Sequence, residues 1–155
     1  MPTLWRFHQV HHSDMNMDVS TASRFHIGEL VISALIRITL IYVLGVKLEE
    51  LVMFEIVLVL AAQFQHSALK VPQSFEHWWW LVFVPPSMHR IHHSVIIKER
   101  NTNYGTIFSL WDRLFGTLLT QVDQERIHIG VGRYRDADKL MLPQLLMLPF
   151  RKVAK

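Results

Sequence analysis

The fold of this chain is decided by the stretch LVISALIRITLIYVLGV at residues 30–46 together with LVMFEIVLVLAAQF at residues 51–64. Both runs are shorter than the roughly 20 residues of an ordinary membrane-spanning helix, and each contains one charge, Arg37 or Glu55. The 155 residues are 50% hydrophobic, so little polar mass is left to wrap two such helices. We therefore predict a transmembrane helical hairpin, with two buried core helices of a soluble bundle as the alternative.

The hairpin brings both of its ends to one face of the membrane, because its tip is the short polar segment 47–50. All Lys and Arg residues other than Lys47 and Arg37 lie outside the hairpin, and by the positive-inside rule that face is cytoplasmic. We expect Arg37 and Glu55 to neutralise each other or to snorkel, rather than to form a functional pair. The predicted fold is all-α: an integral membrane helical bundle with one transmembrane hairpin and a cytosolic histidine-rich helical cap.

A histidine pattern, HxxHH, occurs twice, and each copy is followed by serine. With 10 histidines in the chain, about 0.04 copies are expected from composition alone, so two copies indicate a function. Residues at positions i, i+3 and i+4 share one face of a helix, and we predict helices over residues 4–13 and 88–95. Each copy then offers three imidazole ligands to a metal ion. The two copies are His8, His11 and His12, and His89, His92 and His93.

Composition removes several other kinds of site. The absence of cysteine excludes disulfide frameworks, thiolate zinc sites, iron–sulfur clusters and cysteine nucleophiles. A sequence pI of about 9.5 is compatible with nucleic-acid binding, but the basic residues are dispersed and no nucleic-acid-binding motif accompanies them. An anionic membrane surface explains the charge better, and we expect no nucleic-acid partner.

Six histidines are too many for one metal ion with an open position. Two ions with about three to five nitrogen ligands each fit the number better, and His66, at the end of the second apolar run, lies at the same membrane face. Imidazole suits iron, zinc, copper and nickel. A pair of metal ions beside a bilayer suggests chemistry on a lipid chain, where an unactivated C–H bond requires O₂ activation.

Six short motifs follow one another along the chain: LWRFHQVHHS (4–13), RFH (24–26), FQHS (64–67), MHRIHHS (88–94), NYG (103–105) and WDRLFGT (111–117). In their order and spacing they resemble the fatty acid hydroxylase and sterol desaturase superfamily of integral membrane di-iron oxygenases. The resemblance covers about residues 4–117 and implies a single fatty acid hydroxylase-like domain over residues 1–155. It does not identify the substrate.

The resemblance implies a ligand set for two iron ions, with O₂ as co-substrate and zinc as a substitute in a purified form. The implied metal ligands are His8, His11, His12, His66, His89, His92 and His93. Weaker candidates are His26, with a hydrogen-bonding role as the alternative, and His77, with a membrane-interface role as the alternative. Asn103 and Asp112 are expected to orient ligands, or else to be a turn asparagine and a helix-surface aspartate.

These expectations define a membrane-bound oxidoreductase that uses O₂ and an external electron donor to hydroxylate or desaturate a fatty acyl or sterol-like lipid. One departure qualifies them, because family members carry an earlier HxxxH box and further membrane helices before the segment that corresponds to Leu4. The alternative is therefore a catalytically incomplete metal- or lipid-binding membrane protein, or a fragment that needs an upstream segment or partner. A second copy of the chain, in a homo-oligomer, is one such partner. A soluble zinc hydrolase is disfavoured because no HExxH pattern is present.

Overall fold

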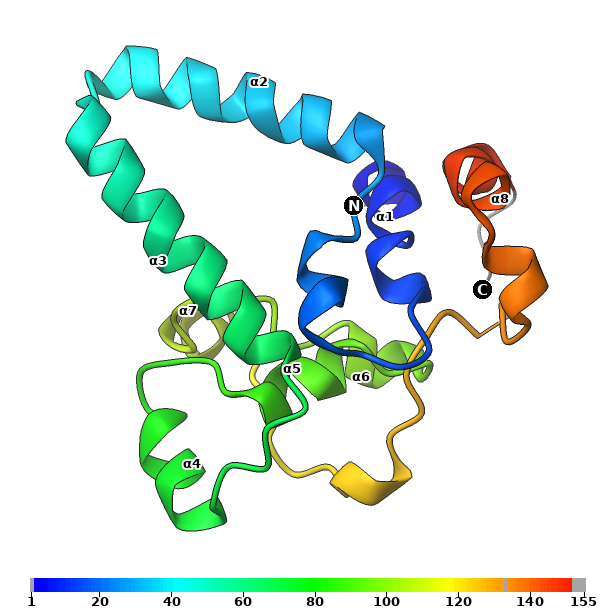
Figure 1. Ribbon diagram of the computed structural model, residues 1–155. Helices are drawn as coiled ribbons and strands as arrows, with labels where there is room; N and C mark the ends of the chain where they lie inside the picture. Colours follow the sequence, from blue (N-terminus) through cyan, green and yellow to red (C-terminus); the bar gives the residue numbers. More distant parts are fainter. Residues whose placement is uncertain (1, 133, 152–155) are drawn as a thin grey trace.

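Helices make up the regular structure of the chain. The computed structural model describes residues 2–132 and 134–151, and in these residues the only β-structure consists of two isolated bridges, Phe83 to Phe108 and Ser94 to Ile129. The predicted all-α class is confirmed. Two long helices, α2 and α3, project from a set of short helices and turns (Figure 1).

The long helices begin and end at identifiable signals. α2 (Ile27–Leu44) starts at His26, whose Nδ1 accepts a hydrogen bond of 2.9 Å from the backbone N–H of Gly28. It ends at Gly45, which adopts the left-handed conformation with φ of 66° that favours glycine. α3 (Leu48–His66) follows after a short turn, and the two helices diverge from that turn (Figure 1).

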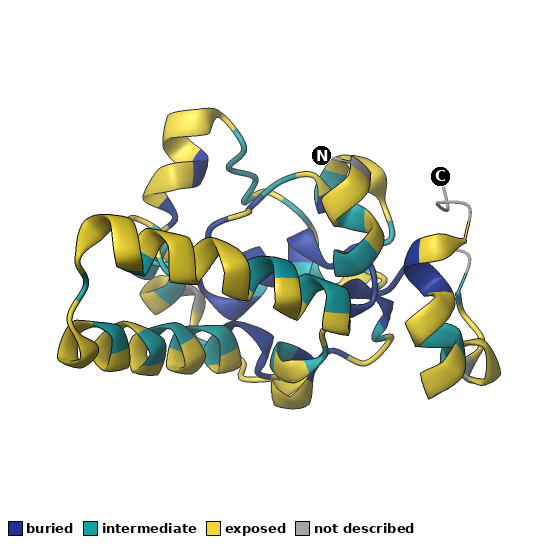
Figure 2. Cartoon of the chain, turned by 90° about the horizontal axis from the view of Figure 1, so that it is seen from above, coloured by how far each residue is buried: buried dark blue, intermediate teal, exposed yellow. Residues whose placement is uncertain are grey.

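The surfaces of α2 and α3 are apolar and exposed. No residue of α2 is buried, and the buried residues of α3 are the last two, Gln65 and His66 (Figure 2). Two buried core helices, the alternative considered from the sequence, are therefore wrong for this chain. By length and composition α2 is the one described helix able to cross a membrane. The first turns of α3 carry Glu49, Glu50 and Glu55, and Glu55 forms a 2.5 Å ion pair with Arg37 of α2.

The buried core lies where the end of α3 meets the short elements. α3 packs against the 3₁₀ helix η2 (Val19–Ser23) and against α5 (Pro86–His92). Fully buried apolar residues are few and include Met88 and Ile91, whereas many buried residues are polar, histidine above all. The core of this part of the molecule is therefore the candidate site itself.

The remaining elements surround this core. α4 (Gln73–Trp79) lies near the end of α3, where the rings of Phe64 and Trp79 are 5.8 Å apart, and α6 (Ile97–Arg100) and α7 (Leu110–Phe115) follow α5 along the chain (Figure 1). The C-terminal elements are η3 (Gln124–Arg126), η4 (Ala137–Leu140), α8 (Leu142–Met147) and η5 (Leu148–Phe150). The last of these packs on α1 (Pro2–His8), where Nε2 of Gln9 donates to the carbonyl of Leu148.

The helices predicted for the two HxxHH copies are only partly correct. α1 ends at His8, and His11 begins a separate 3₁₀ turn, η1 (His11–Ser13), so the expected continuous helix over residues 4–13 is wrong. The predicted helix over residues 88–95 is shifted, since α5 begins at Pro86, where proline is tolerated, and ends at His92. His93 follows as its C-cap. Neither copy therefore lies wholly within one α-helix.

Candidate metal centre

Four histidines converge around the end of α3. Nε2 of His66 lies 3.0 Å from Nε2 of His11, 3.0 Å from Nε2 of His89 and 3.3 Å from Nε2 of His93. The Nε2 atoms of His89 and His93 lie 3.2 Å apart. All four residues are buried. We call them the four-histidine group: His11, His66, His89 and His93.

Three further histidines form a second group beside the first. Ring nitrogens of His8, His12 and His92 lie within 4.8 Å of one another. The two groups are adjacent, because the rings of His12 and His93 stack with their centroids 4.2 Å apart. We call this second set the three-histidine group.

Each HxxHH copy is divided between the two groups. In the first copy the i, i+4 pair, His8 and His12, belongs to the three-histidine group, while His11 joins the other group. In the second copy the i, i+4 pair belongs to the four-histidine group and His92 crosses to the three-histidine group. Both groups therefore depend on the two copies together, in contrast to the sequence expectation that each copy forms a ready cluster by itself.

The nitrogen spacing of the four-histidine group fits a common metal ion. Ligand nitrogens at 2.0–2.1 Å from one ion are separated by about 2.8 to 3.4 Å at bond angles between square and tetrahedral. The four Nε2 separations given above, 3.0–3.3 Å, fall in this interval. Hydrogen bonding does not account for them equally well, because Nδ1–H of His66 donates to the carbonyl of Ala62 at 2.7 Å. Nε2 of His66 then carries a single lone pair and faces three other nitrogens.

Two rings of the three-histidine group are oriented by partners on their outer side. Nδ1 of His92 lies 2.9 Å from the carbonyl of Thr102, and Nδ1 of His8 lies 2.7 Å from Oε1 of Glu29. Donation from Nδ1 leaves Nε2 with its lone pair free, which is the tautomer that a metal requires. Both ring nitrogens of His12 are buried without a hydrogen-bond partner. Such orphaned nitrogens are costly unless a ligand satisfies them.

Burial favours the neutral form of the buried imidazoles in these groups. Loss of solvation, reinforced by repulsion from His8, His66 and His92, lowers the pKa of His11 to about 2. Burial likewise lowers the pKa of His92 to about 4, although hydrogen bonding to the Thr102 carbonyl opposes this shift. The pKa values of His12, His89 and His93 are also well below the ordinary value because of burial. Neutral imidazole is the form that binds metal ions.

Asn103 and Asp112 hold the loop that supports His92, and neither contacts a histidine of the two groups through a hydrogen bond. Asn103 has φ of 53°, and its amide bonds to the carbonyls of Met88 and Leu119 and to the N–H of Leu119. Asp112 accepts from the N–H groups of Tyr104 and Gly105 and from the Thr117 hydroxyl. Asn103 is thus a turn asparagine, but a buried one, and Asp112 is buried rather than at a helix surface.

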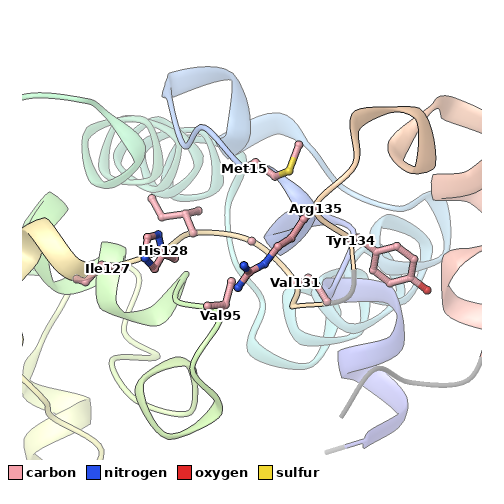
Figure 3. Close-up of a pocket in the computed structure, with 9 residues that line it drawn as sticks. Met15, Val95, Ile127, His128, Val131, Tyr134 and Arg135 are labelled. Atoms are coloured by element: carbon pink, nitrogen blue, oxygen red, sulfur yellow. The ribbon is translucent and has the colours of Figure 1, made fainter.

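The remaining histidines lie outside both groups. The two ring nitrogens of His26 are engaged with the N–H of Gly28 and the carbonyl of Leu146, in the hydrogen-bonding role that was its alternative. His77 is exposed on α4. His128 lines a separate pocket of about 320 Å³ together with Tyr134 and Arg135 (Figure 3). No histidine of either group lines that pocket.

Sequence reasoning missed several supports of the site. The segment at residues 128–130 pairs with the second HxxHH copy, since Val95 N–H donates to the His128 carbonyl and Gly130 N–H donates to the His93 carbonyl. Glu29 was also missed, although an acidic residue in the first turn of an apolar helix was a visible signal. The carbonyls of Ala62 and Thr102 carry no sequence signal at all.

A large cleft connects the histidines with the long helices. Its volume is about 960 Å³, and its wall includes His8, His11, His66, His89 and His92 from both groups. The side formed by α2 presents Ile32 and Ile36. The cleft therefore joins an apolar wall to a group of nitrogen ligands.

Comparisons with known proteins identify the family of the chain. The sequence profile of the fatty acid hydroxylase family matches residues 1–117, and the chain belongs to the fatty acid hydroxylase family. Similar curated proteins include an ornithine lipid hydroxylase from Rhizobium tropici, 30% identical over 129 residues, which cover 83% of this chain and 38% of that protein.

Two alkylglycerol monooxygenases are also similar. The Danio rerio protein is 30% identical over 129 residues, covering 78% of this chain and 26% of the relative. The Homo sapiens protein is 25% identical over 139 residues, covering 83% of this chain and 27% of the relative. The chain thus spans well under half the length of these relatives. No solved structure matches it significantly.

Proposed function

We propose that this chain forms the di-iron centre of a membrane-bound lipid hydroxylase. The single observation that carries the proposal is the convergence of seven histidines into two adjacent groups of four and three. Bound iron would supply reductive activation of O₂ at this position. The balanced reaction is R–H + O₂ + 2e⁻ + 2H⁺ → R–OH + H₂O, with both electrons taken from a separate donor.

The proposed ligands are the seven histidines of the two groups. His66, His92 and His8 present Nε2 toward the centre because their Nδ1 atoms are held by Ala62, Thr102 and Glu29. The four-histidine group is the more enclosed, and the three-histidine group leaves coordination positions for an exchangeable ligand. The buried imidazoles stay neutral, and the carboxylate of Glu29 supports His8 from outside the group.

A lipid chain is the substrate class that suits the cleft. Ile32 and Ile36 line its wall along α2, and the same cleft reaches His66 and His89. An acyl chain lying along α2 can therefore present a C–H bond to the histidines while apolar side chains exclude water. The names of the similar proteins, two kinds of lipid oxygenase, support a lipid substrate and favour insertion of oxygen over desaturation.

The membrane arrangement completes the proposal. α2 and α3 form a hairpin within the membrane, and the ion pair between Arg37 and Glu55 lowers the cost of burying their charges there. The exposed apolar surfaces of both helices support this arrangement. The histidine groups then lie at the cytoplasmic face, in agreement with the charge distribution outside the hairpin.

The proposal is tested with the chain purified in neutral detergent, loaded with Fe(II), and given a reductant, a membrane lipid extract and oxygen-18-labelled O₂. The expected product is a lipid alcohol that carries one labelled oxygen atom. Desaturation instead yields a lipid that has lost two hydrogens and carries no label. A folded, iron-loaded protein that yields neither product would contradict an enzymatic role and would favour the incomplete, lipid- or metal-binding alternative.

A matched pair of variants connects activity to the site. His89→Ala removes a buried member of the four-histidine group, and His77→Ala removes an exposed histidine outside both groups. We expect the first variant to lose product formation and the second to retain it. Equal activity in both variants would remove the link between the reaction and the histidine groups.

A further inference from the structure

The cleft beside the histidines contains a buried cation that no acidic side chain neutralises. Arg100, the last residue of α6, is 8% exposed and lines the cleft. In the part of the chain that the structure describes, its guanidinium makes no ion pair and no hydrogen bond, and its Nε is buried without a partner. A buried N–H group without an acceptor is expensive, because it has lost its water and gained no partner in the protein.

The other charged residues of the cleft wall are paired. Glu29 contacts His8 at 2.7 Å, and Arg37 contacts Glu55 at 2.5 Å. Arg100 is instead placed over the ring of Trp5, with its Cζ 4.3 Å from the ring centroid. This cation–π contact fixes the plane of the guanidinium but satisfies none of its N–H groups.

The position of Arg100 places it beside the three-histidine group. The ring of Trp5 that it covers lies 5.0 Å, centroid to centroid, from the ring of His12. The loop that follows Arg100 supplies the Thr102 carbonyl that holds His92. Glu29 is the acidic residue among the described residues that line the cleft, and Arg100 forms no ion pair with it, so the guanidinium is available to an anion in the cleft.

We propose that Arg100 binds an anionic group, a carboxylate or a phosphate, on the lipid that occupies the cleft. The inference rests on the proposed function in that this lipid is the substrate. A planar guanidinium pairs with either anion through two parallel N–H···O bonds, which fixes the orientation of the group as well as its charge. Arg100 is then a specificity residue: it selects lipids with an anionic end and sets how far the chain extends from the histidines along α2.

The test measures binding rather than turnover. The chain in uncharged detergent is titrated with three probes that share one alkyl length: hexadecanoate, hexadecyl phosphate and hexadecanol. We expect at least one anionic probe to bind about tenfold or more tightly than the alcohol, as a charge-assisted bidentate bond would give. The preferred probe distinguishes a carboxylate-bearing lipid from a phosphate-bearing one. Equal affinity for all three probes would overturn the proposal.

Variants on α6 separate Arg100 from general electrostatics. Arg100→Met keeps an apolar stem and should abolish the preference for the anionic probe, whereas Arg100→Lys should retain part of it. Lys98→Met removes the same charge from an exposed position of the same helix and should leave the preference unchanged. A preference that survives in Arg100→Met would contradict the proposal.

The last part of the test repeats the binding titration with the metal-free protein. If Arg100 holds the anion, the preference persists after the metal has been removed with a chelator. A preference that exists only in the metal-loaded protein would assign the anion to the metal and overturn the proposal. The test measures no reaction, so its result does not depend on whether the chain hydroxylates lipids. The proposal for Arg100 and the proposed hydroxylase activity can therefore be contradicted independently.

Discussion

Nε2 of His66 lies 3.0 Å from Nε2 of His11, although the two residues belong to opposite ends of the long helical pair. His11 precedes α2 and His66 ends α3, so the contact exists only if the chain leaves and returns to one place. The second HxxHH copy then packs against both, because α5 lies against the end of α3. One hairpin thus brings the separate histidine motifs into a common centre.

Glu29→Gln should weaken metal binding at the three-histidine group. The carboxylate lies 2.7 Å from Nδ1 of His8 and orients that ring, and loss of such a partner typically costs about 10- to 100-fold in metal affinity or activity. Titration with a competing chelator measures the change. Glu49→Gln, at an exposed position in the first turn of α3, serves as the control and should bind metal like the unmodified chain.

Acid should destabilise the metal-free protein. The folded-state pKa values of His11 and His92, about 2 and about 4, lie below the unfolded value of 6.5, so below pH 6.5 the unfolded chain binds more protons than the folded one. Stability is therefore complete above pH 6.5 and falls as the pH drops toward 4, by up to about 1.4 kcal/mol per pH unit for each buried imidazole.

Thermal unfolding of the metal-free protein in neutral detergent at several pH values measures this effect. The apparent Tm should decrease steadily between pH 6.5 and pH 4. A Tm that is constant over this interval would mean that the histidines are not buried in the folded protein.

Asp112→Ala should loosen the loop that supports His92. The substitution removes the acceptor of three hydrogen bonds, including those from Tyr104 and Gly105, and should lower the free energy of unfolding by about 2 kcal/mol or more. Thermal unfolding in neutral detergent shows whether the substitution lowers the Tm. Asp123→Ala is the matched control because the ion pair of Asp123 with Arg126 is exposed. Equal destabilisation by both substitutions would contradict the structural role of Asp112.

Because Arg37 and Glu55 form an ion pair between α2 and α3, we expect their substitutions to affect the yield of folded protein non-additively. Arg37→Leu alone leaves Glu55 uncompensated in an apolar environment, so it should reduce the yield of folded, membrane-inserted protein severely. The double variant Arg37→Leu, Glu55→Leu should recover most of that yield. A double variant that is as defective as the single one would argue against a paired position within the membrane.

The sequence predicted the two long helices well because their apolar runs are continuous. The observed helices extend beyond those runs at residues with a visible reason: His26 caps α2, and α3 runs on to His66. Among the described helices α2 alone is long and apolar enough to cross a membrane, so the second span of the predicted hairpin, α3 with acidic residues at its start, stays a prediction. The ion pair of Arg37 with Glu55 agrees with the expected mutual neutralisation.

The structure brings together the seven histidines named as ligands, but in an arrangement that the sequence did not predict. The histidines could be named from spacing and family resemblance, whereas their division between two groups depends on how α5 crosses the end of α3. The spacing predicted that each HxxHH copy lies on one face of a single helix. That prediction was wrong for the first copy because α1 ends at His8 and His11 begins a separate 3₁₀ turn. Arg100 had no sequence signal, because the absence of a partner is a property of the folded chain alone.

The iron content of the folded chain tests directly whether the two histidine groups form a di-iron centre. We expect about two irons per chain, one for each histidine group, after anaerobic loading and removal of loosely bound metal. His89→Ala and His92→Ala, which alter different groups, should each lower that ratio, and His77→Ala should not. A folded chain that retains no iron, or whose iron content is unchanged by His89→Ala and His92→Ala, would contradict the proposed di-iron centre.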